Sequence, residues 1–414
     1  MGRALLVVLG ACGALALQLG SCRTLEPPLP PDLLQLPADA GAARATPPDV
    51  PVYALPLVWQ DYAQPPAPSK APDPATQRFL DACGQGDAAL HRVADHVANL
   101  QLQGAPEPDM AEVAFAFRSQ GSAYVWPRVW TLEGSQFEPQ DVVDRVRAWV
   151  ARGSADGSLR CGISQISDGK KQVLALVATD ALADLERAIA LAVRSGAWVD
   201  FEALLHVETT DLSLVVMGPS GLPKHVTTSR SGRHVRARFH ADQPGRWVAQ
   251  LLGSISSGPR PLLEIEVYAD MAPPSSADLS PAPGEVAVSG PPELRLQTWV
   301  NRLRSEHRLS ALRRNAQLDA LAKAHAEAMR AANRLAHDVG DGDPKQRIEQ
   351  AGLSPSLAGE NVARAPSLAR AHRALWFSPS HRGNLLHPSF TDLGIGVVKD
   401  ERGNLWVAEL FARF

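Results

Sequence analysis

A nine-residue segment near the C-terminus decides the fold of this chain: Trp376-Phe377-Ser378-Pro379-Ser380-His381-Arg382-Gly383-Asn384. Its Ser-Pro pair is typical of a helix N-cap followed by proline in the first turn, so we expect His381 on a short helix. Two further motifs precede it, Ala336-His337-Asp338 and Gly359-Glu360-Asn361. Together the three motifs hold the imidazole and carboxylate groups whose types and spacing suggest a site.

Helical periodicity surrounds these motifs. Apolar residues at three- and four-residue steps predict helices near residues 296–303, 318–329, 344–351 and 367–376. Alternating residues 393–397 and 405–411, joined by turn-forming residues, predict a hairpin. Helices followed by a hairpin suggest α+β layering.

The ordered motifs resemble the bacterial branch of the CAP superfamily, which comprises the cysteine-rich secretory, antigen 5 and pathogenesis-related 1 proteins with their SCP domains. The residues that carry the resemblance are His337, the Gly359-Glu360-Asn361 triplet, the segment from Trp376 to Arg382, and Gly394-Ile395-Gly396. We assign residues 293–414 to this domain. The resemblance implies an α-β-α sandwich with a cleft lined by two histidines and acidic side chains, which in some members holds a divalent metal such as zinc.

The family pattern transfers to this chain position by position. His337 matches the first histidine of the cleft, Glu360 the glutamate of the triplet, and His381 the second histidine. Eukaryotic members carry a second glutamate three residues after the tryptophan, where this chain has Pro379. Three candidate metal ligands, His337, Glu360 and His381, therefore stand where the fuller pattern has four.

Two polar neighbours are candidate cleft residues as well. Asn361 is placed to orient the carboxylate of Glu360, and Arg382 to pair with Glu360 or with an anion. The alternatives are that Asn361 satisfies backbone groups and that Arg382 is solvated. His325 is in helical register with apolar residues, so we expect a packing role for it rather than a ligand role.

The N-terminus, residues 1–22, has the composition of an export signal. Arg3 is followed by an apolar run that is too short and too rich in small residues for a spanning helix. The run ends in Leu19-Gly20-Ser21-Cys22, which resembles the bacterial lipobox, so we expect lipidation of Cys22 and a lipid anchor in the cell envelope. Simple cleavage and secretion is the alternative.

Residues 23–75 contain repeated Pro-Pro pairs and predict an extended tether, of which 52–62 is the part expected to dock on the next domain. Two cysteines, Cys83 and Cys161, remain beyond the signal. In an oxidising compartment such a pair predicts a disulfide, and two separate buried thiols are the alternative.

Two domains and a linker precede the C-terminal domain. Residues 76–195 mix helices, expected at 79–100, 110–117 and 142–150, with a strand at 125–132 and a hairpin over 159–177. Their order suggests a degenerate CAP-like copy without a site, or else an unrelated α+β domain. Residues 196–270 carry short alternating strands that suggest a small Ig-like β-sandwich, and residues 271–292 are rich in Pro, Ser and Ala, as expected of a linker.

Two functions of different class fit these features. The preferred one is a membrane-tethered binding module for an envelope lipid, glycan or protein. The alternative is a metal-assisted hydrolase in which His337, Glu360 and His381 hold an ion or act as acid and base. The net charge of −3 argues against a nucleic-acid partner. Nucleophile-elbow, His-Glu-x-x-His and Walker A motifs do not occur in the sequence, which favours the binding role.

Overall fold

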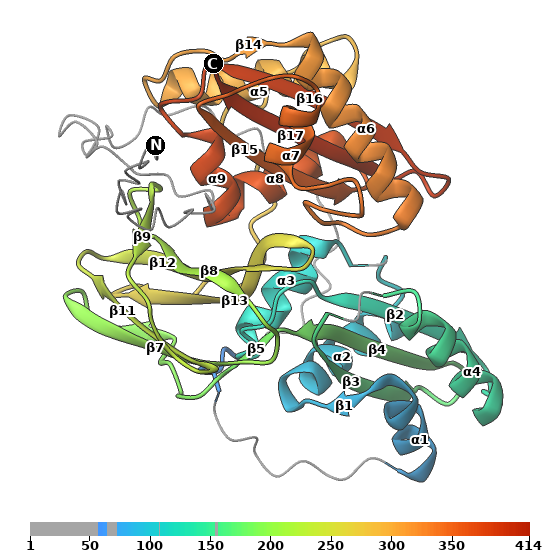
Figure 1. The fold of residues 1–414 in the computed structure, drawn as a ribbon. Coiled ribbons are helices and arrows are strands. Elements are labelled where there is room, and N and C mark those ends of the chain that lie inside the picture. Colours follow the sequence, from blue (N-terminus) through green and yellow to red (C-terminus); the bar gives the residue numbers. More distant parts are fainter. Residues whose placement is uncertain (1–56, 64–72, 107, 154–155) are drawn as a thin grey trace, which may run out of the picture.

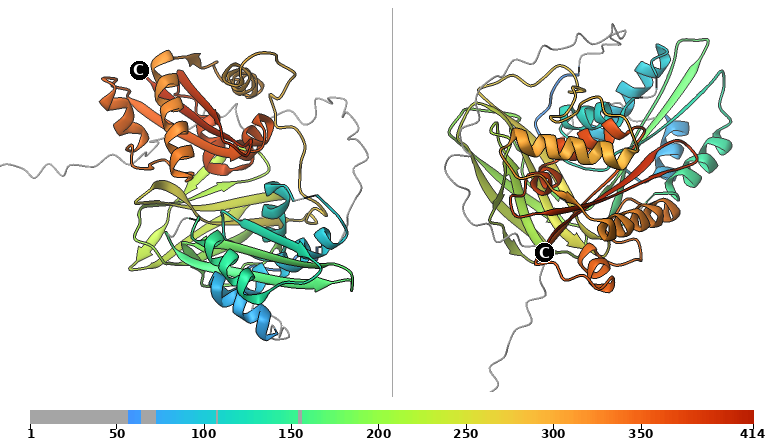
Figure 2. Two further views of the ribbon diagram at one scale, coloured as in Figure 1. Left: turned by 90° about the vertical axis from the view of Figure 1, so that its right-hand side faces the viewer. Right: turned by 90° about the horizontal axis from the view of Figure 1, so that it is seen from above.

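The computed structural model describes residues 57–63, 73–106, 108–153 and 156–414, which form three units in chain order (Figure 1). The C-terminal unit lies over the other two (Figure 2). The predicted signal, Cys22 and most of the predicted tether lie outside the described residues. Over the part that is described, no helix combines the length and the apolar character needed to cross a membrane.

The described end of the tether docks on the folded units. Tyr62 is fully buried, and its backbone exchanges hydrogen bonds with Ile189 at 3.0 and 3.2 Å. The ring of Trp59 meets that of Tyr268 edge-on, with 5.5 Å between centroids. The predicted docking of this segment is therefore confirmed for residues 57–62.

The first unit, residues 74–181, places a four-stranded sheet between two pairs of helices. Its elements are α1 (Pro74–Cys83), β1 (Gln85–Gly86), α2 (Ala88–Leu102), α3 (Met110–Ser119), β2 (Arg128–Gly134), α4 (Pro139–Val150), β3 (Ser158–Ser167) and β4 (Gln172–Ala181). The strand order is β1-β3-β4-β2, with β1 parallel to β3 and the other pairs antiparallel. Helices α1 and α4 share a core with one face of the sheet, and α2 and α3 with the other.

The predicted single helix over residues 79–100 is wrong, because the chain forms two helices there. Between them, Gly84 approaches β3 so closely that a Cβ would lie 2.8 Å from the carbonyl oxygen of Leu159. Asp87 then caps α2 by accepting a hydrogen bond from the backbone N–H of Leu90 at 3.0 Å. A glycine and a cap in sequence thus end one helix and begin the next.

The predicted disulfide between Cys83 and Cys161 is confirmed. It joins the end of α1 to β3, with 6.2 Å between the two Cα atoms. Both residues belong to the core that α1 and α4 share with the sheet. The bond therefore fastens the first helix of the unit to its central hairpin.

The middle unit consists of two β-sheets that share one core. The sheet orders are β10-β11-β7-β5 and β6-β13-β12-β8-β9. The strands are β5 (Ala183–Leu185), β6 (Ala192–Val193), β7 (Ala197–Leu205), β8 (Thr210–Met217), β9 (Pro223–Val226), β10 (Ser229–Ser231), β11 (His234–Ala241), β12 (Gly245–Ile255) and β13 (Gly258–Ala269). The predicted boundary at residue 196 is too late, since β5 pairs with β7 and β6 pairs with β13.

The C-terminal unit repeats the helix–sheet–helix layering. Its elements are α5 (Pro292–Glu306), β14 (Arg313–Arg314), α6 (Ala316–Ala332), α7 (Pro344–Gln350), β15 (Leu357–Ala365), α8 (Leu368–Phe377), α9 (Pro379–Leu385), β16 (Asp392–Lys399) and β17 (Leu405–Arg413). The sheet order is β14-β16-β17-β15. One core lies between the sheet and α6 and α7, and another between the sheet and α5 and α8 (Figure 1). The predicted helices and hairpin are present, but the sequence reasoning did not predict β15.

Residues 271–291 connect the middle and C-terminal units without forming a helix or strand. They are nevertheless fixed to the C-terminal unit. The guanidinium of Arg373 in α8 donates two hydrogen bonds of 2.8 Å to the carboxylate of Glu285. The indole N–H of Trp299 in α5 donates to the backbone oxygen of Val286 at 2.9 Å.

Candidate functional site

The candidate site residues meet at β15, the last strand in the order of the C-terminal sheet. Successive residues of a strand point to opposite faces. Glu360 therefore reaches the side of α6 and α7, whereas Asn361 reaches α9 on the other side. His337 follows α6, and His381 lies in α9, on the short helix predicted for it.

Glu360 is the centre of a buried ion cluster. Its Oε1 accepts a hydrogen bond from Nδ1 of His337 at 2.8 Å, and its Oε2 accepts one from Nη2 of Arg347 in α7. Arg347 also donates to the backbone oxygen of His337 at 2.8 Å and to that of Gly342 at 2.5 Å. The exposed fractions of Glu360 and Arg347 are only 5% and 6%. Both carboxylate oxygens are thus engaged by donors of the protein.

His325 of α6 also belongs to this cluster, on the side of the sheet that α6 and α7 cover. Its Nδ1 lies 2.7 Å from Oδ2 of Asp341, and its Nε2 lies 3.0 Å from the backbone oxygen of Ala336. Its Nε2 is also 3.6 Å from Oε1 of Glu360. The ring is fully buried with both nitrogens bonded, which agrees with the packing role expected for it.

The surroundings of Glu360 keep its carboxylate ionised. Burial raises the pKa of Glu360, but the hydrogen bond from His337 and the positive charge of Arg347 lower it more. The pKa of Glu360 therefore lies below its ordinary value. At neutral pH the pair formed with Arg347 is a salt bridge between two full charges.

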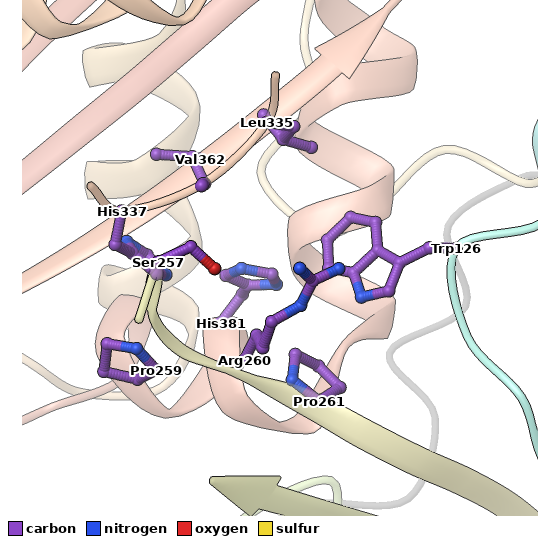
Figure 3. Close-up of a pocket in the computed structure, with 10 residues that line it drawn as sticks. Trp126, Ser257, Pro259, Arg260, Pro261, Leu335, His337, Val362 and His381 are labelled. Atoms are coloured by element: carbon purple, nitrogen blue, oxygen red, sulfur yellow. The ribbon is translucent and has the colours of Figure 1, made fainter. Parts of the chain in front are cut away.

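His381 faces a pocket from α9, and His337 lines the same pocket (Figure 3). Nδ1 of His381 is buried and has no hydrogen-bond partner among the residues that the structure describes. Burial, helped by the nearby His337, lowers the pKa of His381 to about 3. The imidazole of His381 is therefore neutral at pH 7.

All three units contribute to this pocket. Trp126 comes from the first unit, and the middle unit supplies the turn between β12 and β13 with the start of β13 (Figure 3). The cavity has a volume of about 20 Å³, which is room for about one water-sized group. Its lining residues are Trp126, Ser257, Pro259, Arg260, Pro261, Leu335, Ala336, His337, Val362 and His381.

The turn between β12 and β13 closes directly on His337. The backbone N–H of Asp338 donates to the backbone oxygen of Ser257 at 3.2 Å. The next residue, Gly258, has a φ of 96°, and a Cβ there would lie 3.0 Å from Cβ of His337. A larger residue would be strained at this position and would push the turn away from the histidine.

Trp126 reaches the pocket from a segment that the sequence reasoning assigned to a strand. The predicted strand over residues 125–132 begins only at Arg128. Trp126 has a φ of 62°, which lies outside the extended region and is unusual for a large side chain. This backbone turn directs the indole toward the pocket rather than along the sheet (Figure 3).

The predicted pairing of Arg382 with Glu360 is wrong, and so is the alternative that Arg382 is solvated. The guanidinium does not pair with Glu360, because Arg347 holds that position, and it is not solvated, since only 6% of Arg382 is exposed. It stacks 3.7 Å from the ring centroid of Trp376 and donates to the backbone oxygen of Gly221 at 3.2 Å. Arg382 thus ties α9 to the middle unit.

Asn361 does not take the predicted role beside Glu360; the alternative, that it satisfies a backbone group, is the one that the structure supports. Asn361 does not orient the side chain of Glu360, since the two residues point to opposite faces of the sheet. Its amide Nδ2 donates to Oε2 of Glu409 at 3.2 Å and to the backbone oxygen of His381 at 3.3 Å. Nδ2 of Asn384 donates to its Oδ1 at 3.0 Å. Asn361 therefore holds α9, and with it His381, against the sheet.

Two functional candidates escaped the sequence reasoning, Arg347 and Glu409. Glu409 is fully buried in β17, and within the described part of the chain its Oε1 has no hydrogen-bond partner. Burial raises the pKa of Glu409 to about 7, although the hydrogen bond from Asn361 opposes this. Glu409 could have been found in the sequence as a lone acidic residue within an apolar strand. Arg347 could have been found as an arginine next to Ile348 in a short predicted helix.

The predicted metal ligands were tested for their fit to a divalent ion. In the described residues, no group of three or more His, Cys, Asp or Glu side chains is arranged to hold a metal. Glu360 has both oxygens engaged, one of them by the cationic Arg347, which would repel a second cation. His337, Glu360 and His381 in this arrangement therefore do not fit the zinc site that the resemblance implies.

Comparisons with known proteins agree with this fold. Residues 298–410 match the family model described as the cysteine-rich secretory protein family, CAP. Protein YkwD of Bacillus subtilis is 28% identical over 123 residues, which are 29% of this chain and 47% of that protein. The chain thus spans about half the length of this curated relative.

Solved structures were compared as well. An outer surface protein from Borrelia burgdorferi is 24% identical, with a TM-score of 0.29, and the match covers 30% of this chain and 92% of that one. An extracellular protein containing an SCP domain from Bacillus anthracis is 19% identical, with a TM-score of 0.28, covering 56% and 89%. The family match identifies residues 298–410 of this chain as a CAP domain.

Proposed function

We propose that this chain is an exported envelope protein whose CAP domain binds a lipid, glycan or protein partner without catalysing a reaction. The main support for this proposal is that both carboxylate oxygens of Glu360 are already hydrogen-bonded within the protein. Its two oxygens accept hydrogen bonds from His337 and Arg347. A carboxylate held in this way offers neither a free general base nor an open metal ligand.

The hydroxyl in the pocket supports the same conclusion. Ser257 is buried, and its Oγ has no hydrogen-bond partner in the described chain, so neither His337 nor His381 is bonded to it. A serine nucleophile needs a base within hydrogen-bond reach to take its proton. The described part of the pocket therefore lacks the nucleophile–base contact of a serine hydrolase.

Two assays on the full chain with Cys22→Ser distinguish a binding function from a hydrolytic one: co-sedimentation and substrate turnover. Co-sedimentation with isolated cell-envelope fragments should be weakened at least about tenfold by His381→Ala and unchanged by His234→Ala, a matched change of a half-exposed histidine on β11. Ester, amide and glycoside substrates should not be turned over. Turnover that disappears in Glu360→Gln would overturn the proposal in favour of a hydrolase.

Anchoring through Cys22 is part of this proposal, and the likeness of residues 19–22 to a lipobox supports it. Cys22→Ser should move the protein from the membrane fraction to the soluble fraction of a bacterial host, because the thioether to the lipid cannot form. Cys12→Ser is the matched control and should leave the protein in the membrane fraction. A Cys22→Ser protein that still sediments with membranes would refute lipid anchoring.

A further inference from the structure

Buried polar atoms without hydrogen-bond partners gather in the pocket of Figure 3. Among the described residues, four that line the pocket carry such an atom: Trp126 (Nε1), Ser257 (Oγ), Arg260 (Nε) and His381 (Nδ1). Ser257 is only 3% exposed, and Figure 3 shows its hydroxyl pointing toward the ring of His381. Because an unpaired buried polar group is costly, the concentration of four in one cavity indicates a ligand.

The chemistry of these atoms selects an acceptor-rich ligand. The indole N–H of Trp126 and the Nε–H of Arg260 can only donate, and the hydroxyl of Ser257 can donate as well. One water molecule accepts two hydrogen bonds, those of the indole of Trp126 and the guanidinium of Arg260, and could meet Ser257 only by donating to its hydroxyl. A carboxylate accepts about four, through two oxygens, so it can satisfy all three donors at once.

The charges around the pocket also favour an anion. Asp156 of the first unit accepts hydrogen bonds of 2.9 Å from Arg260 of the middle unit and from Arg334 of the C-terminal unit. Asp180 also acts on Arg260 and pairs with Arg128 at 4.0 Å, so two carboxylates face three guanidinium groups at the point where the units meet. The guanidinium of Arg260 also lies over the ring of Trp126, 5.4 Å from its centroid, which holds both donors in place.

We propose that the pocket between the three units binds the carboxylate of a ligand, with Trp126, Ser257 and Arg260 as donors and His381 beside them. The proposal rests on the binding role proposed above and names its ligand chemistry. The cavity has room for about one carboxylate oxygen, so the second oxygen and the rest of the ligand lie at its mouth. A carboxylate of this kind occurs on a peptide C-terminus and on an acidic sugar.

The test is a titration of the ¹⁵N-labelled Cys22→Ser chain with sodium acetate at constant ionic strength, followed by the indole N–H resonance of Trp126. Trp126→Phe assigns this resonance among the 9 tryptophans. The expected result is a saturable shift, with an affinity about tenfold weaker in Ser257→Ala. Ser256→Ala is the matched control, because Ser256 is exposed in the same turn, and it should bind acetate like the parent chain. A shift that does not saturate, or equal binding by both serine variants, would overturn the proposal.

Two further probes identify the source of the carboxylate. A short peptide is titrated as free acid and as C-terminal amide, and glucuronate is titrated separately. Whichever acid saturates the Trp126 shift at lower concentration is the class of ligand, whereas an amide that binds as tightly as the acid would overturn the carboxylate assignment. Failure here is distinguishable from failure of the binding role: a flat acetate titration together with His381-dependent binding to envelope fragments would remove only the present inference.

A second inference comes from the first unit, whose order of elements matches that of the CAP domain. The series α1-β1-α2-α3-β2-α4-β3-β4 corresponds to α5-β14-α6-α7-β15-α8-β16-β17, with α9 as the addition. Their sheets, β1-β3-β4-β2 and β14-β16-β17-β15, agree in strand order. They also agree in direction, since the first pair is parallel and the others antiparallel in both.

Individual contacts fix the correspondence residue by residue. A Cβ on Gly162 would meet the backbone of Leu90 at 2.0 Å, and one on Gly394 would meet the backbone of Leu318 at 2.2 Å. In each unit the lack of a side chain at this strand glycine therefore lets the backbone of the long helix, α2 or α6, pack directly against the strand. Gly162 pairs with Val177 across the hairpin, as Gly394 pairs with Leu410.

The ion cluster of the CAP domain then maps onto three valines. Glu360 pairs with Leu410, as Val129 pairs with Val177. His325 lies seven residues after Leu318, as Val97 does after Leu90, and Arg347 lies four residues after the cap Asp343, as Val113 does after the cap Asp109. The corresponding residues are Val97 for His325, Val113 for Arg347 and Val129 for Glu360.

We infer that the first unit is a second CAP fold in which these three valines replace the polar cluster, so that it cannot carry the site itself. It contributes instead Trp126, one wall of the pocket of the C-terminal copy. The alternative of an unrelated α+β domain gives no reason for the three polar positions to coincide with three valines.

The test restores the cluster in the first unit. Val129→Glu alone should lower the thermal midpoint of this unit by about 6 °C or more, because it places a carboxylate without a partner in a partly buried position against the apolar core. Val97→His/Val113→Arg/Val129→Glu should recover part of that loss, since the three new groups would contact one another. The matched control carries methionine in place of arginine at position 113, Val97→His/Val113→Met/Val129→Glu, which supplies similar length without the charge and should recover nothing. A triple variant no more stable than its control would overturn the correspondence.

Discussion

Glu360 and Arg347 form a salt bridge that is almost completely withdrawn from water. Removing two charges from water is costly, and the cost is offset only while both partners are present with their remaining hydrogen bonds. Arg347 meets this condition through the carboxylate and two backbone oxygens. The pair therefore stabilises the domain as a unit, and either partner alone destabilises it.

Arg347→Met tests this dependence. The change should lower the free energy of unfolding by about 3–5 kcal/mol, because Glu360 would keep its charge in an apolar setting with one partner lost. Urea denaturation of the full chain measures the loss. Arg330→Met, an exposed arginine at the end of α6, should change stability by less than about 0.5 kcal/mol. Equal midpoints for both variants would show that the buried pair contributes nothing.

Glu409 makes the stability of the CAP domain depend on pH. Its folded pKa of about 7 exceeds the ordinary 4.5, so between these values the native state holds a proton that the unfolded state has lost. Its contribution is present below pH 4.5 and is lost as pH rises toward 7. As the pH rises from 4.5 to 7, the free energy of unfolding of the parent chain should therefore fall relative to that of Glu409→Gln by up to about 1.4 kcal/mol per pH unit. Urea denaturation from pH 4.5 to 7 measures both proteins. If the stability of the parent chain and that of Glu409→Gln change in parallel with pH, the pKa of Glu409 is not raised.

At the scale of single residues, motifs predicted the site only in part. His337, Glu360 and His381 were found because their residue types and order are distinctive; the structure bonds His337 to Glu360 and places His337 and His381 in one pocket, which Glu360 does not line. Arg347 lies 13 residues before Glu360 and on another element. No local pattern shows that its side chain turns inward, so the partner of Glu360 was instead predicted to be Arg382.

At the scale of elements, the close crossings of helix and strand decide the layering. Gly394 and Gly396 of β16 face the backbone of α6 so closely that a Cβ on either would lie within 2.4 Å of a backbone atom. The sheet and the helix can share a core only because these positions lack side chains. The alternation of glycine with apolar residues in this strand therefore has a packing cause.

Gly394→Ala and Gly383→Ala should have opposite effects. The first places a Cβ 2.2 Å from the backbone of Leu318 and should cost about 3 kcal/mol, since neither backbone can move away easily. The second lies within α9, where a Cβ meets nothing within 4 Å, and should stabilise by about 0.5–1 kcal/mol. Thermal unfolding of both variants checks the prediction, and losses of similar size would contradict the crossing geometry.

Elements were predicted well where a pattern was long and local. The helices and the hairpin of the CAP domain follow from periodicity, whereas β15 was missed because its sequence, Leu-Ala-Gly-Glu-Asn-Val-Ala-Arg-Ala, has neither a helical nor an alternating pattern. Its strand conformation comes from pairing with β17, which is distant in the sequence. The split between α1 and α2 has the same origin, since the intervening β1 is held by β3.

At the scale of the whole molecule, covalent and ionic links act at different places. The disulfide lies within the first unit, and Asp156 joins this unit to the other two through Arg260 and Arg334. Stability within a unit and assembly of the pocket should therefore respond to different changes.

The variant Cys83→Ala/Cys161→Ala should destabilise the first unit by about 2–5 kcal/mol. Calorimetry should show the unfolding transition of this unit at lower temperature while the transition of the CAP domain stays in place. Asp156→Asn is the comparison, because it weakens the contact between units and keeps the disulfide. A uniform shift of all transitions in the cysteine variant would mean that the units do not unfold separately.

The central claim is that Glu360 pairs with Arg347 and does not bind a metal. Its most direct test is a calorimetric titration of zinc into the Cys22→Ser chain at pH 7, repeated with the additional changes His337→Ala and His381→Ala. No stoichiometric zinc binding that depends on either histidine is expected. One zinc ion per chain, bound by the parent protein and lost in both variants, would contradict this claim.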